Sequence, residues 1–123
     1  MSSELSIENK KIQKPDAVLM TLKGNLDLFT FRDLKSAFEE QFKNHSEKLV
    51  LLNMGAVPYI ASSGWGVLMA RAKALKNEGG MMALYALNEG NIKVYETLNI
   101  SLLLPLAENL EDAKALLSQA KKD

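Results

Sequence analysis

The run KLVLLNMGAVPYIASSGWG, residues 48–66, contains the pattern that decides the fold of this 123-residue chain. Its first six residues form a short apolar run between polar flanks, which is too brief for a free-standing helix and is typical of a buried central strand. Apolar positions after Gly66 continue at helical spacing until Gly79 and Gly80, which commonly end helices: they include Val67, Leu68, Ala72 and Leu75. The run therefore predicts a strand that leads directly into a helix.

Upstream of this run the sequence predicts two strands and a helix. Residues 3–8 alternate as in a half-buried strand, residues 9–16 are a polar loop, and residues 17–23 form a more continuous apolar strand. A helix over residues 31–43 follows, and Thr30 with Asp33 resembles a capping box at its start. The apolar stripe of this helix consists of Phe31, Leu34, Phe38 and Phe42. We expect Phe31, Leu34 and Phe38 to be buried against the sheet.

Downstream of the run the same alternation of strands and helices continues. We expect a strand over residues 81–87, a short helix over residues 91–98 and a last strand over residues 102–104. Asn109, with Asp112 three residues on, opens a terminal helix. This order predicts an α/β fold with parallel pairing through the crossovers. We expect a single domain over residues 1–123, with a mixed four- to five-stranded sheet and about four helices packed on it.

The composition limits the possible functions. The charges of fifteen basic and fifteen acidic residues cancel, and the pI is near 6.6. The chain therefore lacks the net positive charge that is typical of a nucleic-acid-binding protein. The chain has no cysteine and one histidine, His45, which we place at the exposed end of the first helix; disulfides and the usual zinc sites are excluded. The polar first residues predict no signal peptide, and no stretch of the sequence approaches the apolar length of a membrane span. We expect a small cytoplasmic domain that uses no metal, cofactor or membrane.

Ser62 and Ser63 are the candidate residues for chemistry. A strand followed by Ser-Ser-Gly at a helix start brings hydroxyls and free backbone N–H groups together. Either serine could simply cap the helix, or the site could accept a phosphate, whose charge the helix dipole would tolerate. The sequence has no phosphate-binding glycine loop and no nucleophile elbow. An enzyme with Ser62 as nucleophile finds little support, because no general base is placed near it.

Two motifs carry a family resemblance. Residues 24–27, Gly-Asn-Leu-Asp, and residues 53–66, followed by Lys-Asn-Glu-Gly-Gly at residues 76–80, resemble the STAS-domain family of anti-sigma factor antagonists. The order of the expected elements is similar over about residues 3–121. The positions that match the family signature in register are Asn53, Val57, Tyr59, Ile60, Ser62, Ser63, Gly64 and Gly66.

The resemblance implies a non-enzymatic bacterial regulator that works by partner switching. In the family, the unphosphorylated protein binds an anti-sigma factor that is also a serine kinase. Phosphorylation of the first serine of the signature breaks this complex, and a phosphatase resets it. Carried over by position, Ser62 is the phosphoacceptor. The residues implied in partner binding are Asn25, Asp27, Ala61, Ser63, Gly64 and Trp65.

Three positions depart from the family pattern. Ala61 replaces the aspartate before the phosphoacceptor and Asn25 replaces a glutamate, so two carboxylates are missing from the implied kinase-facing surface. Trp65 replaces a leucine and could be either a partner-binding anchor or a side chain partly buried against the sheet. The alternative function is a STAS subunit that docks in another assembly, such as a lipid-transport ATPase complex, without phosphorylation. We also expect Asp27, Ser62, Ser63 and Trp65 to share one face.

Overall fold

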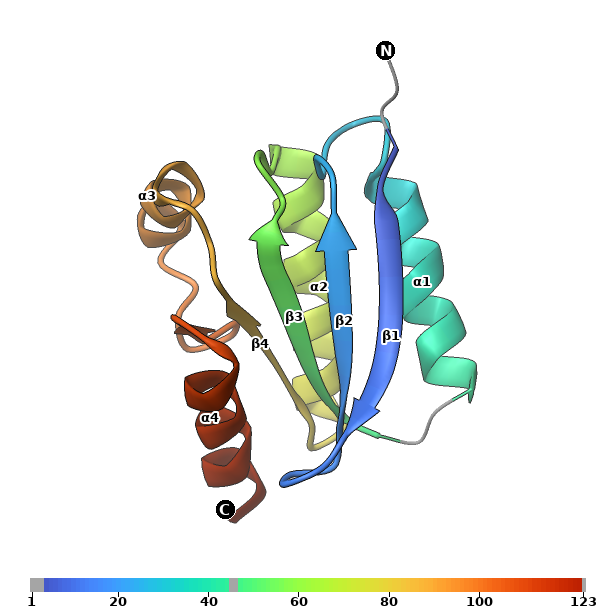
Figure 1. Ribbon diagram of the computed structural model, residues 1–123, viewed down its shortest axis with the longest axis vertical. Coiled ribbons are helices and arrows are strands. Elements are labelled where there is room, and N and C mark those ends of the chain that lie inside the picture. Colours follow the sequence, from blue (N-terminus) through green and yellow to red (C-terminus); the bar gives the residue numbers. More distant parts are fainter. Residues whose placement is uncertain (1–3, 45–46, 123) are drawn as a thin grey trace.

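The computed structural model describes residues 4–44 and 47–122 and has an α/β architecture (Figure 1). One five-stranded sheet has the order β1-β2-β3-β4-β5, in which β1 is antiparallel to β2 and every other pair is parallel. The expected α/β fold with a mixed sheet and four helices is therefore confirmed. In chain order the elements are β1 (Ser6–Ile12), β2 (Ala17–Lys23), α1 (Phe31–Asn44), β3 (Leu49–Ala56), α2 (Ser62–Asn77), β4 (Met81–Tyr85), α3 (Glu89–Leu98), β5 (Leu106–Ala107) and α4 (Leu110–Lys122).

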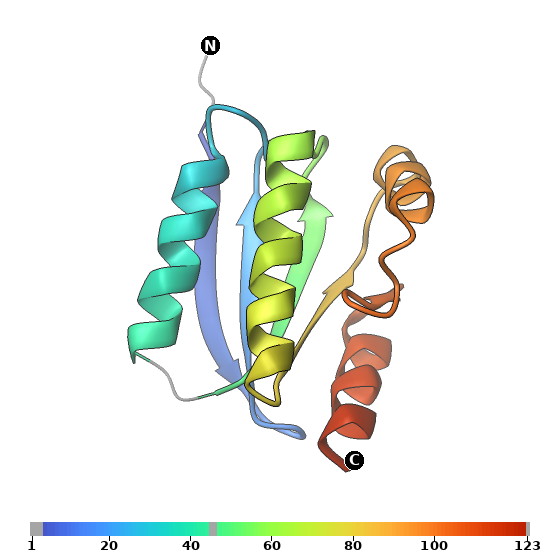
Figure 2. The same ribbon diagram turned by 180° about the vertical axis from the view of Figure 1, so that it is seen from behind.

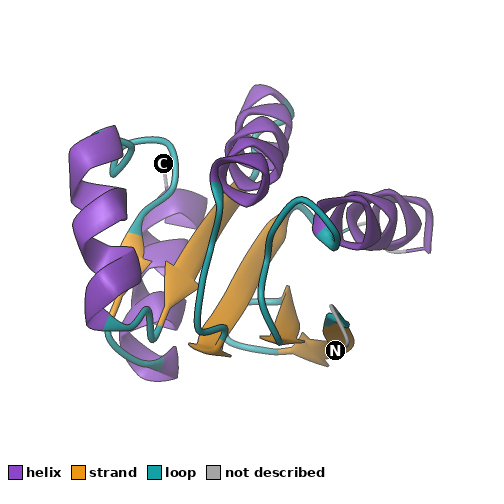
Figure 3. Cartoon of the chain, turned by 90° about the horizontal axis from the view of Figure 1, so that it is seen from above, coloured by secondary structure: helices purple, strands orange, loops and turns teal. Residues whose placement is uncertain are grey.

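The helices lie on both faces of the sheet and produce two cores. Helices α1 and α2 run side by side over one face (Figure 2), and seen from above they stand together on one side of the strands (Figure 3). Helix α4 packs against β3, β4 and β5. Strand β3 contributes Val50 and Leu52 to the larger core and Leu51 to the smaller core. A strand covered on both faces needs apolar side chains at successive positions, which explains its continuous apolar run.

The first strand lies further along the chain than the sequence predicts. Residues 9–12, expected in a loop, continue β1 to Ile12, which pairs with Ala17 of β2. Strand β1 is an edge strand with mostly exposed side chains. Its Ile7 and Ile12 pack against the cores, and its polar residues pair with β2 through backbone hydrogen bonds, so a polar stretch can extend it.

The last predicted strand is also wrong. Residues 102–104 belong to a turn in which Leu103 and Leu104 N–H donate to the carbonyl of Ile100, and β5 comes later, at Leu106–Ala107. Leu104 is buried whereas Leu102 is almost fully exposed. The apolarity of three successive leucines predicts a strand, but only Leu104 is fully buried, and Leu103 packs partly buried against the core.

Helix α1 begins where the sequence predicts, but its stripe is only partly buried. Leu34 and Phe38 are in the core and Phe31 is half-buried, whereas Phe42 is 49% exposed and Gln41 is buried instead. The capping-box interpretation is wrong, because the Thr30 hydroxyl bonds back into the preceding loop. His45 lies outside the described residues.

Candidate functional site

Two loops that are distant in sequence form one surface at the end of the sheet where α1 and α2 begin, uppermost in Figure 1. The loop of residues 24–30 follows β2, and the loop of residues 57–61 follows β3. Leu26 N–H donates to Tyr59 O at 2.9 Å, and Ala61 N–H donates to Leu26 O at 2.8 Å. Because the carboxyl ends of parallel strands meet at one edge of the sheet, the two sequence motifs become spatial neighbours.

Gly64 allows the first turn of α2 to approach the 24–30 loop. A Cβ atom at Gly64 would lie 2.6 Å from Cγ of Leu26 and 2.9 Å from its carbonyl oxygen. Both distances are too short for a real contact, so only glycine fits here without movement. Gly64 is buried, and its contribution to the surface is to position Ser62 and Ser63.

Thr30 and Asp27 shape the first loop. The buried Thr30 hydroxyl donates to Asn25 O at 2.8 Å and accepts from Asp27 N–H at 3.0 Å. The Asp27 carboxylate accepts from Phe29 N–H at 2.9 Å. These bonds satisfy the backbone of the loop internally, so Leu28 and Phe29 project outward.

The second loop is held from its other side by α3. Asn91 is buried, and its Nδ2 donates to Val57 O at 3.1 Å. Asn88 caps α3 by accepting from Asn91 N–H at 2.9 Å, and its Nδ2 donates to Pro58 O at 2.9 Å. The loop before Ser62 is therefore fixed by two neighbours before any partner arrives.

Helix α2 begins at Ser62 with an uncapped N-terminus. Its N-cap residue is Ala61, which has no side-chain acceptor, and the first turn carries no acidic residue. The prediction that Ser62 or Ser63 caps the helix is wrong, because both serines lie inside the first turn. Ser62 is exposed, whereas Oγ of the half-buried Ser63 lacks a hydrogen-bond partner. The positive end of the helix dipole therefore stands beside an exposed hydroxyl.

Trp65 is a core residue. Its side chain is 3% exposed, and its ring centroid lies 6.2 Å from that of Tyr95. Burial raises the pKa of Tyr95, whose hydroxyl donates to Leu104 O at 2.7 Å. The expectation that Trp65 shares an exposed face with Ser62 is wrong, because the indole packs into the core against Tyr95.

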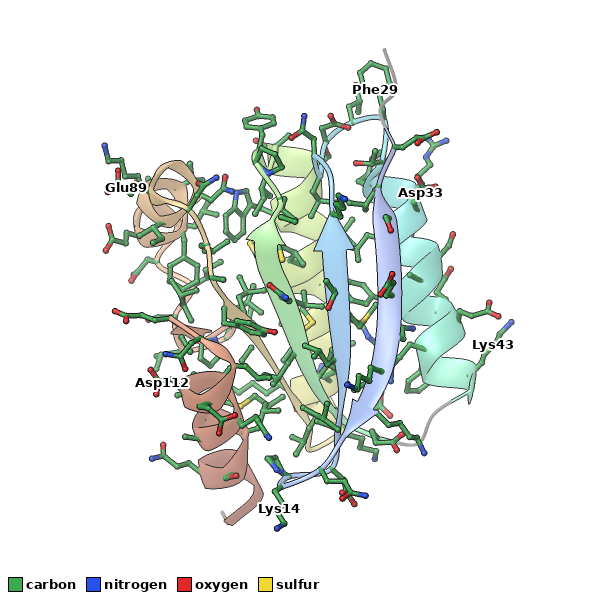
Figure 4. All side chains as sticks on the ribbon, viewed as in Figure 1. Lys14, Phe29, Asp33, Lys43, Glu89 and Asp112 are labelled. Carbon is green, nitrogen blue, oxygen red and sulfur yellow. The ribbon has the colours of Figure 1, made fainter. Side chains whose placement is uncertain are left out.

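Three exposed apolar side chains lie on the two loops that meet at this end of the sheet. Phe29 is 75% exposed, Leu28 is 70% exposed and Tyr59 is 55% exposed; Phe29 points away from the fold at the upper end of Figure 4. The sequence analysis did not identify these three residues as part of the site. Large apolar residues that belong to no helical or strand period could have indicated an exposed binding surface. The surface, called the apical surface below, consists of Asn25, Asp27, Leu28, Phe29, Tyr59 and Ser62.

The described residues provide no group of three or more acidic or histidine side chains that could hold a metal ion. None of the helices within residues 4–44 and 47–122 is long and apolar enough to cross a membrane.

Comparison with known proteins supplies the remaining observations. The family model described as STAS domain matches residues 9–113. An anti-sigma F factor antagonist from Paenibacillus polymyxa is 23% identical over 92 residues, which are 75% of this chain and 79% of that protein. The crystal structure of an anti-sigma factor antagonist from Mycobacterium paratuberculosis superposes with a TM-score of 0.83 at 17% identity, covering 96% of this chain and 97% of that chain. The phosphorylated form of the Bacillus cell fate determinant SpoIIAA superposes with a TM-score of 0.68 at 16% identity, covering 90% and 99%.

Proposed function

The chain belongs to the STAS domain family, and we propose that it is an anti-sigma factor antagonist that acts by binding rather than by catalysis. The observation that carries the proposal is the apical surface, where an exposed serine at an uncapped helix N-terminus and three exposed apolar side chains lie at the same end of the sheet. The names of the Paenibacillus relative and of the Mycobacterium structure support an anti-sigma factor as the partner.

The apolar part of the apical surface provides the affinity. Phe29 and Tyr59 are large, and aromatic side chains are enriched among the residues that dominate interface energies. Their loops are held by the bonds to Leu26, Asn88 and Asn91, so little ordering cost remains when a partner binds. An exposed apolar patch on preorganised loops is typical of a protein-binding site.

Phosphorylation of Ser62 provides the control. A phosphate at the first helical residue would find unbonded N–H groups and the positive end of the dipole of α2, so the fold would tolerate it. The anti-sigma factor, built to fit a neutral hydroxyl, would then face a desolvated dianion. In this scheme the partner is also the kinase, and a phosphatase restores the binding form.

Replacing Ser62 by aspartate tests this function. We expect Ser62→Asp to melt within a few degrees of the wild type and to bind the anti-sigma factor at least about tenfold more weakly. Ser101→Asp, on the exposed turn after α3, is the matched control and should bind normally. Isothermal titration calorimetry would measure both affinities, and an unchanged Kd for Ser62→Asp would contradict the proposal.

Ala61 favours a second candidate, a docking subunit of another assembly such as a lipid-transport ATPase complex. Alanine can neither orient the Ser62 hydroxyl nor contact a kinase as a carboxylate would. Incubation of wild type and Ser62→Ala with the bound kinase and ATP, followed by mass spectrometry, separates the two functions. Phosphate on the wild type alone supports the switch. Intact binding without phosphate on either protein would indicate a constitutive binder rather than a switch.

A further inference from the structure

A groove of about 400 Å³ runs between α1 and α2. These are the two helices that lie side by side over one face of the sheet in Figure 2. Its volume is within the range of pockets that hold small molecules. Most of its lining is apolar, with a few polar groups. The residues are Phe31, Lys35, Phe38 and Glu39 from α1, and Ser63, Gly66, Val67, Ala70, Arg71 and Ala74 from α2.

The groove exists because α2 carries small residues where it faces α1. Gly66, Ala70 and Ala74 are four residues apart and therefore share one face of the helix. A Cβ atom at Gly66 would meet nothing within 4 Å. Because no side chain fills this space, the ring of Phe31 and the side chain of Val67 stay half-exposed and form walls of the groove.

Arg71 is the main polar group in this groove. Its guanidinium carbon lies 5.0 Å from the ring centroid of Phe42 and 6.0 Å from that of Phe38, so two cation–π contacts hold the group in place. Its Nε and Nη2 atoms are buried and have no hydrogen-bond partner. These two atoms form one edge of the guanidinium fork, the geometry that binds a carboxylate through two parallel hydrogen bonds.

The charges around the groove favour an anion. Lys35 and Arg71 line it with positive charge, against the single carboxylate of Glu39. Burial lowers the pKa of Arg71 and the charge of Glu78 raises it, and an arginine stays protonated at neutral pH. Ser63 adds a second unpartnered group, the buried Oγ, two helical turns before Arg71. Leaving buried donors unpaired is costly, so both groups stand to gain from a ligand.

We propose that the groove between α1 and α2 binds a small amphipathic carboxylate, with its apolar body against Phe31, Phe38 and Val67 and its carboxylate on the guanidinium of Arg71. The rise of the helix separates Ser63 from Arg71 by about 12 Å, so an elongated ligand can reach toward both. This proposal does not rest on the proposed function, since it involves neither Ser62 nor the apical surface.

The proposal can be tested by titrating the ¹⁵N-labelled full chain with sodium decanoate below its critical micelle concentration. The shifts of the amide NMR signals report binding. We expect saturable shifts in residues 63–74 and around Phe38, and at least tenfold weaker binding of decanol, which lacks the carboxylate. Arg71→Met should weaken decanoate binding at least tenfold while leaving decanol binding unchanged. Shifts scattered over the surface, or equal affinities for the two probes, would overturn the proposal.

A pair of tryptophan variants provides the control for the position of the site. Ala70 lies in the groove, whereas Lys73 is exposed on the same helix and does not line it. Ala70→Trp should fill the groove and abolish the shifts, and Lys73→Trp should bind decanoate as the wild type does. Both tryptophan substitutions are at the surface of α2, so circular dichroism should show that both variants are folded. They therefore test the position of the site even if Arg71→Met is unstable. Decanoate binding that persists in Ala70→Trp would refute the groove as the site.

Discussion

Gly64 and Gly66 stand two residues apart in α2, yet a methyl group added to each would meet different surroundings. At Gly64 it would overlap Leu26, whereas at Gly66 it would meet open space. The first glycine therefore joins α2 to the 24–30 loop, and the second leaves the neighbouring groove unfilled. One residue type in one short motif has two separate structural effects.

The residue-scale prediction compares Gly64→Ala with Gly66→Ala. We expect Gly64→Ala to destabilise the protein by about 1–3 kcal/mol, because the side chain is forced into a packed contact. Gly66→Ala should stabilise by up to about 1 kcal/mol, the helix propensity that alanine gains over glycine. Urea denaturation followed by circular dichroism measures both changes, and equal effects would show that Gly64 is not held against Leu26.

At the scale of the element, the apolar stripe of α1 is buried at the centre of the helix and partly exposed to solvent at its C-terminal end. Leu34 is fully buried, whereas Phe42 is half-exposed and its ring lies under the guanidinium of Arg71. The helix therefore places Leu34 in the core and Phe42 against Arg71 at its partly exposed end, although both belong to one helical stripe.

The element-scale prediction follows from this division. Leu34→Ala should cost about 2–5 kcal/mol, because it leaves a cavity in the core. Phe42→Ala should cost about 1 kcal/mol or less, since it removes an exposed ring and one cation–π contact. Thermal and chemical unfolding would rank the two variants. A cost for Leu34→Ala below about 0.5 kcal/mol, the range of surface positions, would mean that the buried face of α1 is misassigned.

On the scale of the whole molecule, the apical surface depends on three segments that the chain keeps far apart. The loop of residues 57–61 is joined to the 24–30 loop on one side and to α3 on the other. The buried amide of Asn91 is the connection to Val57. Helix α3 thus supports the serine site without contributing to its exposed residues.

The whole-molecule prediction concerns this support. Asn91→Ala should destabilise the protein by about 1–3 kcal/mol, because Val57 O is left without its partner. It should also speed amide hydrogen exchange in residues 57–61. Asn109→Ala is the matched control: Asn109 accepts from Asp112 N–H at the start of α4, so its loss should cost about 1 kcal/mol without changing exchange in that loop. Equal exchange rates in both variants would argue against the connection.

The sequence by itself determined the kinds of elements and most of their places. The continuous apolar run of residues 17–23 and the helical period from Phe31 onward predict β2 and the start of α1 correctly, because both patterns reflect burial along a regular repeat. The family motifs also identified Asp27 and Ser62. The structure places Asp27 in the 24–30 loop and Ser62 at the start of α2, directly after the 57–61 loop that bonds to Leu26. Their roles in partner binding and phosphorylation stay predictions.

The tertiary structure alone decided which way side chains face and what surrounds them. Trp65 is buried against Tyr95, Gly64 fits against Leu26, and β1 extends through polar residues because β2 pairs with it. The exposure of Phe29 and the unpaired edge of Arg71 likewise depend on segments far away in the chain. A local pattern records the average burial of a segment, whereas each of these features depends on a particular neighbour that only the packing of the whole chain supplies.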